Sequence, residues 1–294
     1  MKWYTLHTFW NTNQVYSDIL IFLPHSADDC GMIDFIRSSF VWGYDISNPI
    51  LSRYIQHEAD RWSREVAFSA IDRFFSDPSN ADFKISIFEV HIPRGFCDLN
   101  RPWELACPSV VDNTYWKQYY DTIIDTVFTV LQSAKFCLQL HTMASYEMIS
   151  SWELDRSKDE KDIEYFLTSI YSGACRECNI LTRTPDEREL TCSEFDTILS
   201  HSFSKQQITL LRDISYRLIE NRPSTDITKF LPSSFLEITK WSLATDETKG
   251  SYDTSKIILS PTKVRLYGDI LADSFQEYLS KFIHNNIWPS FITK

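Results

Sequence analysis

The stretch Lys84–Pro102, KISIFEVHIPRGFCDLNRP, joins a strand-like run to a loop of charged and polar residues. The short apolar run over Lys84–Val90 predicts a buried β-strand. The loop behind it carries Arg94 and Arg101 with Asp98 between them. Arginine presents a rigid fork of donors that fits a carboxylate, and an aspartate can hold that fork in place. Two interpretations follow: a pocket that grips an anionic substrate, or a buried Arg–Asp pair that only pins the loop.

Other apolar runs show the same arrangement of a predicted strand that ends near polar residues. Short, continuously apolar segments of this kind are typical of strands buried in the middle of a sheet. Polar side chains at their ends would then gather at one edge of the sheet. The further predicted strands are Tyr16–Leu23 before His25, Lys135–Leu140 before His141, and Ser234–Lys240, which contains Glu237.

Segments with apolar residues three and four apart separate these strands, as expected for amphipathic helices. The alternation predicts an α/β fold: a mostly parallel or mixed twisted sheet with helices on both faces. No polar segment is long enough to be a convincing linker, so residues 1–294 are expected to form a single domain. The predicted helices are Glu58–Phe75, Asn113–Ala134, Lys158–Ser172, Ser204–Asn221 and a last helix from Ser260 to about Asn285.

Composition excludes several classes of function. The net charge is −11 and no run of lysines and arginines occurs, so a surface that tracks nucleic-acid phosphates is not expected. The apolar stretch Ile19–Pro24 is too short to span a membrane, and the first twenty residues lack a signal-peptide pattern. Seven scattered cysteines do not suggest a disulfide framework. We therefore expect a cytoplasmic protein with reduced thiols.

The two histidines at strand ends suggest a metal site. In α/β sheets, sites form just beyond the carboxyl ends of the strands, where His25 and His141 are predicted to lie. Imidazole nitrogens at two adjacent strand ends can meet at one divalent metal ion. A third ligand would be a carboxylate, and Asp28, Glu58 and Asp60 are all candidates.

Six sequence blocks follow one another along the chain: PHS (Pro24–Ser26), EADRWSREVA (Glu58–Ala67), PRGFCDLNRP (Pro93–Pro102), YWKQYYDTI (Tyr115–Ile123), LQLHT (Leu138–Thr142) and LEI (Leu236–Ile238). Taken together and in this order, they resemble the N-formylglutamate amidohydrolase family. That family is similar in fold to zinc carboxypeptidases and hydrolyses the carboxamide bond of N-formylglutamate. The resemblance therefore implies a zinc carboxypeptidase-like (phosphorylase/hydrolase-like) fold.

The resemblance implies a set of metal ligands. His25 and His141 would bind one Zn²⁺ per chain, with another divalent transition metal as the alternative. Asp60 would supply the carboxylate ligand, and Glu58 and Asp28 are rivals for that position. The spacing of His25 and Asp28 even imitates the one found in carboxypeptidases.

The resemblance also implies how a substrate would be held and attacked. Asn100 and Arg101 would grip its carboxylate, and Arg94 would assist there or polarise the scissile carbonyl. Glu237 would be the general base that takes a proton from a metal-activated water. A glutamate inside an apolar strand is costly without a partner, which favours a site over simple packing. The alternative is a glutamate on the exposed face of an edge strand.

Several residues depart from the family pattern around the proposed ligands and base. Because the ligands and base are kept and their surroundings are not, we predict metal-dependent hydrolysis of a changed substrate. The departures are Ala27 for a glycine, Gln139 for an aspartate, Thr142 for a serine, and Tyr119-Tyr120 for a Tyr-His pair.

The sequence thus predicts a zinc-dependent amidohydrolase that cleaves a carboxamide C–N bond of a small anionic substrate. That substrate would be an N-formyl or N-acyl amino acid, or a peptide-like molecule. One alternative is a metallohydrolase acting on another C–N bond, such as an amidine or a peptide terminus, in a specialised biosynthetic pathway. Another is a non-catalytic carboxylate-binding protein of the same fold. Metal content separates this last alternative from the enzymes.

Overall fold

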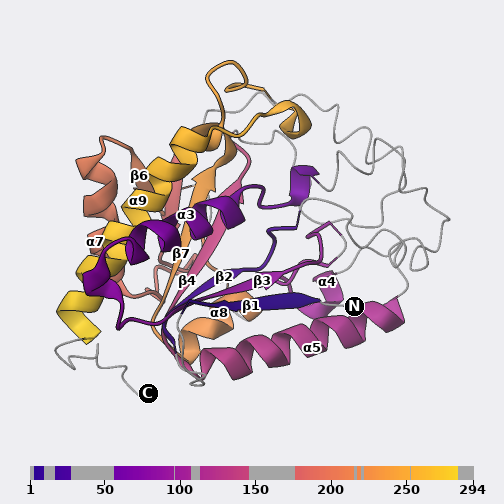
Figure 1. Ribbon diagram of the computed structural model, residues 1–294. Helices are drawn as coiled ribbons and strands as arrows, with labels where there is room; N and C mark the ends of the chain where they lie inside the picture. Colours follow the sequence, from indigo (N-terminus) through magenta and orange to yellow (C-terminus); the bar gives the residue numbers. More distant parts are fainter. Residues whose placement is uncertain are drawn as a thin grey trace.

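Seven strands form one mixed sheet in the computed structural model of the chain (Figure 1). The structure describes residues 3–9, 17–27, 56–95, 97–106, 113–145, 176–214, 217–219, 222–251 and 253–283. Across the sheet the strands follow the order β1-β3-β2-β4-β7-β5-β6. Their bounds are β1 Tyr4–Thr8, β2 Ser17–Leu23, β3 Ile85–Val90, β4 Ala134–Met143, β5 Cys178–Leu181, β6 Leu210–Arg212 and β7 Ser233–Thr239.

The centre of the sheet is parallel. Strand β2 pairs in parallel with β3 and with β4, and β4 pairs in parallel with β7. The antiparallel pairs are β1 with β3 and β5 with β7, while β5 and β6 run parallel. Every residue of β2 is buried, which explains why its sequence reads as a continuous apolar run instead of an alternating one.

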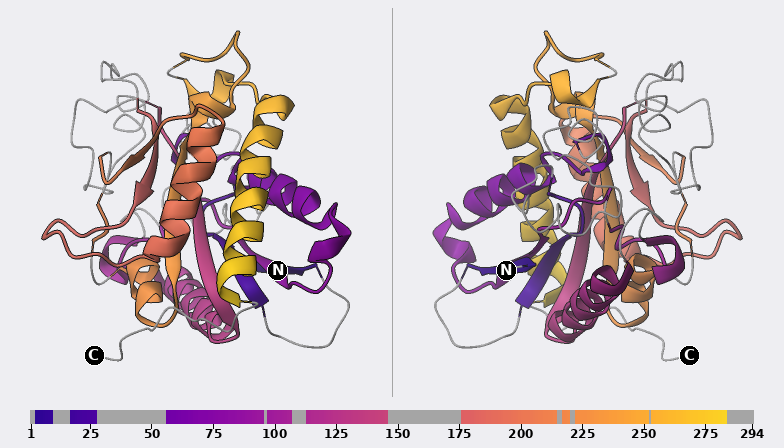
Figure 2. Two further views of the ribbon diagram at one scale, coloured as in Figure 1. Left: turned by 90° about the vertical axis from the view of Figure 1, so that its left-hand side faces the viewer. Right: turned by 90° about the vertical axis from the view of Figure 1, so that its right-hand side faces the viewer.

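Helices cover both faces of the sheet, as Figures 1 and 2 show. Helices α3, α7 and α9 pack on one face, and α5 and the short α8 lie on the other. None of the helices within the described ranges is long and apolar enough to cross a membrane. The bounds are α3 Ser63–Phe75, α4 Trp103–Ala106, α5 Asn113–Leu131, α7 Ser193–Lys205, α8 Pro223–Asp226 and α9 Pro261–Tyr278; the short helical turns are η1 Pro78–Asn80, η2 Ile227–Lys229, η3 Lys240–Leu243, η4 Thr254–Lys256 and η5 Leu279–Ile283.

The predicted fold class is confirmed: the chain forms an α/β fold with a mixed sheet and helices on both faces. The helix predicted over Ser204–Asn221 is wrong. Helix α7 ends at Lys205, and β6 follows at Leu210–Arg212. Gln207 between them has a positive φ of 58°, which turns the chain so that the apolar run behind it pairs with β5. The helix predicted over Lys158–Ser172 lies outside the described residues.

Helices α3 and α9 pack tightly against each other at Gly268. A Cβ atom built on Gly268 would lie 2.7 Å from the Cβ of Ser69 and 3.0 Å from the amide nitrogen of Ala70. Neither of these atoms can move without moving the backbone of α3. A glycine inside α9 is therefore explained by close packing of the two helices.

The Gly268→Ala substitution should lower the free energy of unfolding by about 1–2 kcal/mol. Alanine gains about 1 kcal/mol in helix propensity. Overpacking costs typically 1–3 kcal/mol, and a contact that can relax only by moving a helix backbone lies at the upper end of that range, about 2–3 kcal/mol. Urea denaturation would measure the change, with Asp273→Ala at an exposed position of α9 as the control. A Gly268→Ala protein as stable as the wild type would contradict the tight contact.

A buried carboxyl group joins α7 to the sheet. Asp196 is fully buried. It accepts hydrogen bonds of 2.6 Å from Ser234 Oγ and 2.6 Å from Thr191 Oγ1. Burial outweighs these bonds and raises the pKa of Asp196 to about 7. The folded protein therefore holds a proton that the unfolded chain releases at much lower pH.

Stability should fall as the pH rises through neutrality because of Asp196. A raised folded-state pKa stabilises the fold fully below the ordinary carboxyl pKa, and this stabilisation is lost as the pH passes about 7. The loss is on the order of 4 kcal/mol for a three-unit shift. The free energy of unfolding, measured by denaturation at pH 5 and pH 8, should decrease between these pH values in the wild type and decrease less in Asp196→Asn. Equal decreases in the two proteins would contradict the raised pKa.

Candidate metal site

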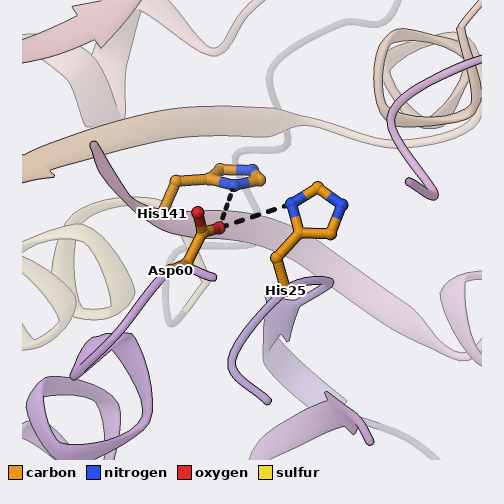
Figure 3. A group of neighbouring side chains, drawn as sticks. All are labelled: His25, Asp60 and His141. Atoms are coloured by element: carbon orange, nitrogen blue, oxygen red, sulfur yellow. Dashed lines mark hydrogen bonds and ion pairs between the residues drawn. The ribbon is translucent and has the colours of Figure 1, made fainter. Parts of the chain in front are cut away.

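Three side chains from separate segments meet at the carboxyl edge of the parallel strands (Figure 3). His25 follows β2, His141 lies near the end of β4, and Asp60 precedes α3. Strands β2 and β4 are paired in parallel, with Phe22 opposite Gln139. Their register carries the two histidines to the same edge of the sheet, which is where α/β folds place their sites.

The carboxylate of Asp60 lies between the two imidazoles. Its Oδ2 atom is 2.7 Å from His141 Nδ1 and 3.5 Å from His25 Nδ1. All three residues are buried. One ligand atom from each residue lies within 4.8 Å of the other two, so the three atoms can reach a single metal ion. The structure thus brings together three of the residues proposed as ligands.

The backbone around Asp60 is held in an unusual conformation. The Asp60 amide donates a 2.8 Å hydrogen bond to the carbonyl of His25. Two residues further on, Trp62 has a left-handed φ of 74° at the start of α3. Such a conformation is strained for a bulky residue and is typically found near functional sites. It turns the chain sharply between Asp60 and the helix.

The electrostatics of the three residues are strongly coupled. Burial alone would raise the pKa of Asp60, but the charge and hydrogen bond of His141, together with the nearby imidazole of His25, hold that pKa well below its usual range. Burial works against protonation of His141, but Asp60 outweighs it and raises the His141 pKa. A buried carboxylate that favours a proton on the neighbouring imidazole can favour a divalent cation in place of that proton.

The donor set fits a zinc ion. Both ring nitrogens of His25 are buried, and neither has a hydrogen-bond partner of good geometry in the part of the chain that the structure describes. Buried imidazole nitrogens without such partners are unusual unless a ligand completes them. Two imidazoles and one carboxylate make up the ligand set of many catalytic zinc sites, which leave a further position open.

Asp98 connects this group to the arginine loop. It is fully buried, and its Oδ1 atom lies 3.1 Å from His25 Nε2. Its Oδ2 atom lies 3.2 Å from Arg94 Nε and 3.5 Å from Arg101 Nε. The Asn100 amide donates a 2.9 Å hydrogen bond to Oδ1. A carboxylate behind a metal-ligating histidine orients its ring and raises its basicity.

The arginine loop offers donors beside the three-residue group. Arg94 and Arg101 are only partly exposed, and Asp98 and other nearby carboxylates hold the pKa of Arg94 above its usual range against the effect of burial. The backbone carbonyl of Arg101 accepts a 2.7 Å hydrogen bond from the Tyr120 hydroxyl of α5. The Oδ1 atom of Asn100 is buried and has no hydrogen-bond partner among the residues described. The contacts with Asp98 and with the Tyr120 hydroxyl hold the loop in place from two sides.

Glu237 lies next to His141 in the sheet. The two residues are register partners on β7 and β4, so their side chains share a face. Glu237 is half-buried. Burial raises its pKa, His141 and Arg94 lower it, and Asp60 adds to the increase. Glu237 does not belong to the candidate ligand group formed by the described residues.

Of the two other carboxylates predicted as possible metal ligands, Glu58 and Asp28, only Glu58 lies among the described residues. Glu58 is half-buried and acts electrostatically on Arg94, but it is not part of the candidate ligand group. The structure therefore favours Asp60 over Glu58. Asp28 lies outside the described residues and stays a rival prediction.

Lys240 is a residue of the site that sequence patterns did not identify. It follows β7 on the turn η3, is fully buried, and donates from Nζ to the carbonyl of His57 at 2.8 Å. Burial lowers the pKa of Lys240 to about 8, while Asp60 and Glu58 limit the decrease. The contact ties β7 to the segment that carries Asp60. A lysine after a strand is usually solvated, so its sequence carries no signal of this role.

Two solved structures are similar in fold to this chain. A gene product from Agrobacterium tumefaciens is 12% identical, with a TM-score of 0.56 over 95% of this chain and 96% of that one. N-formylglutamate amidohydrolase from Ralstonia eutropha is 10% identical, with a TM-score of 0.50 over 92% of this chain and 98% of that one. No protein-family model and no curated protein matches the sequence. At such identities the likeness shows the fold alone.

If the three-residue group binds zinc, removal of either histidine should remove the metal. The wild-type protein should purify with about one zinc per chain, and His25→Ala and His141→Ala should hold little. His201→Ala, an exposed histidine on α7, is the matched control. Because Asp60 raises the His141 pKa, protons should compete and zinc affinity should fall about tenfold or more from pH 8 to pH 6. Metal analysis showing stoichiometric zinc in His141→Ala would contradict the site.

Proposed function

We propose that this protein is a metal-dependent amidohydrolase that cleaves a carboxamide C–N bond of a small carboxylate-bearing substrate. The observation that carries the proposal is that three groups of side chains lie together at one edge of the sheet. The group of His25, Asp60 and His141 lies beside Glu237 and is linked through Asp98 to the arginine loop.

His25, Asp60 and His141 would hold the metal, with one Zn²⁺ per chain as the first choice. Zinc bound in such a site supplies a Lewis acid for the amide carbonyl and makes water nucleophilic near neutral pH. Asp98 would keep the His25 ring oriented through the 3.1 Å approach to Nε2. Lys240 would keep the segment of Asp60 in place.

Glu237 would act as the general base. Its raised pKa brings it closer to neutrality, where a carboxylate transfers protons most effectively. It would take a proton from the attacking water and return it to the nitrogen of the leaving amine. His141 and Arg94 lower the Glu237 pKa and so oppose the increase caused by burial.

The arginine loop would bind the substrate carboxylate. Asn100 and Arg101 would hold that group through charge-assisted hydrogen bonds, and Arg94 would hold it or polarise the scissile carbonyl. The contacts of Asp98 fix both guanidinium groups before a substrate arrives. Because the arginines are already held in position, binding of the substrate carboxylate would also orient the scissile bond at the metal group.

The Glu237→Gln variant should lose turnover and keep its metal. Removal of a general base costs about 10²–10⁴-fold in kcat, because glutamine accepts no proton. A panel of N-formyl and N-acyl amino acids would be assayed with the zinc-supplemented protein, and zinc content would be measured in parallel.

Glu247→Gln, an exposed glutamate in the loop after β7, is the matched control. An unchanged rate in Glu237→Gln would remove Glu237 from the mechanism. A wild-type protein that binds these compounds and zinc without hydrolysing any of them would instead indicate a carboxylate-binding protein of the same fold.

A further inference from the structure

One buried polar side chain at the same edge of the sheet has no part in the chemistry above. Asn179 lies on β5 and is fully buried. It is the register partner of Glu237 in the antiparallel pair of β5 and β7. Directly paired residues on neighbouring strands point to the same face, with their Cβ atoms about 5 Å apart. The Asn179 amide is therefore a close neighbour of the Glu237 carboxylate.

The register places the functional groups in one line across the sheet. His141 pairs with Glu237, and Glu237 pairs with Asn179. The arginine loop follows β3, at the other end of this line. The order is therefore carboxylate-binding loop, metal group, Glu237 and Asn179. With strands about 4.8 Å apart, Asn179 lies roughly 10 Å from His141 along the sheet.

The Asn179 amide has an unmet donor. Its Oδ1 atom accepts a long 3.4 Å hydrogen bond from the Ile214 amide, beyond the end of β6. Its Nδ2 atom is buried and has no hydrogen-bond partner among the described residues. Buried polar groups are satisfied in the great majority of cases, so an unsatisfied one beside a site points to a ligand that completes it.

We propose that Asn179 is a substrate-binding residue that donates from Nδ2 to a neutral oxygen in the acyl group of the substrate. This inference rests on the proposed function, because the arginine loop and the metal group set the direction of the bound molecule. With the carboxylate held at the arginine loop and the scissile amide at the metal group, the acyl chain runs past Glu237 toward β5.

The chemistry of Asn179 selects the kind of acyl group. A second carboxylate there would lie beside the charge of Glu237 and be repelled by it. A neutral amide carbonyl or hydroxyl oxygen accepts from Nδ2 without that repulsion. A formyl group is too short to reach from the metal group to Asn179. The substrate class is therefore an N-acyl amino acid whose acyl chain carries a neutral hydrogen-bond acceptor, as a peptide-like acyl group does.

Three N-acylalanines of matched length test the proposal in the zinc-supplemented wild-type protein. Their acyl groups are succinamoyl, which ends in a neutral amide, succinyl, which ends in a carboxylate, and pentanoyl, which ends in a methyl group. The value of kcat/KM should be at least about tenfold higher for succinamoyl than for either of the others. Equal values for succinamoyl and pentanoyl would overturn the role of Asn179.

Variants of Asn179 supply the second test. Asn179→Leu should lower the succinamoyl-to-pentanoyl ratio of kcat/KM by about tenfold, because leucine fills the position without a donor. Asn179→Ala repeats the test with less bulk if the leucine variant folds poorly. Ile180→Val, the next residue on β5 and part of the core on the opposite face, is the control and should keep the wild-type ratio. An unchanged ratio in both Asn179 variants would overturn the proposal.

Binding separates a failure of this inference from a failure of the proposed function. If the wild-type protein hydrolyses none of the three compounds, the proposed hydrolysis fails and calorimetry still tests Asn179. The zinc-supplemented protein should then bind N-succinamoylalanine about tenfold more tightly than N-pentanoylalanine, and Asn179→Leu should remove the difference. Equal binding of the two compounds would reject Asn179 as an acyl-group donor.

Discussion

The parallel pairing of β2, β4 and β7 is the constraint on which the candidate site depends. It brings His25 and His141 to one edge and sets Glu237 directly beside His141. A slip of one residue in the β4–β7 register would turn Glu237 to the opposite face. On that face the apolar side chains of Leu140 and Leu236 pack against the core of α3, α7 and α9. The strand register that builds the core is therefore also the register that assembles the site.

Two buried carboxylates at this edge are stabilised by charged or hydrogen-bonding neighbours. Asp60 sits between two imidazoles, and Asp98 faces His25 on one side and two guanidinium groups on the other. Ionised groups in such surroundings are costly unless they are paired. The aspartate that braces the two arginines also connects the arginine loop to the candidate metal site, through its approach to His25.

Much of the fold could be predicted from local patterns. Apolar runs with strand lengths located β2, β3, β4 and β7, and helical spacing located α3, α5 and α9. The helix expected over Ser204–Asn221 was wrong because α7 starts and ends earlier and a long-range pairing with β5 captures Leu210–Arg212. Three-residue strands of this kind have too little periodicity to predict, and only their neighbours stabilise them.

The sequence by itself determined the residue types of the site and their positions after strands: histidines at two strand ends, a glutamate in an apolar strand, and arginines around an aspartate. Only the tertiary structure decided which of them meet. Asp60, and not Glu58, lies in the candidate metal group. The hydrogen bond from the Asp60 amide to the His25 carbonyl and the turn at Trp62 hold Asp60 beside the two histidines. The tertiary structure also places Asn179 beside Glu237 and Lys240 beside the carbonyl of His57. Their proximity arises from strand pairing and from a contact between segments 183 residues apart, which no local pattern encodes.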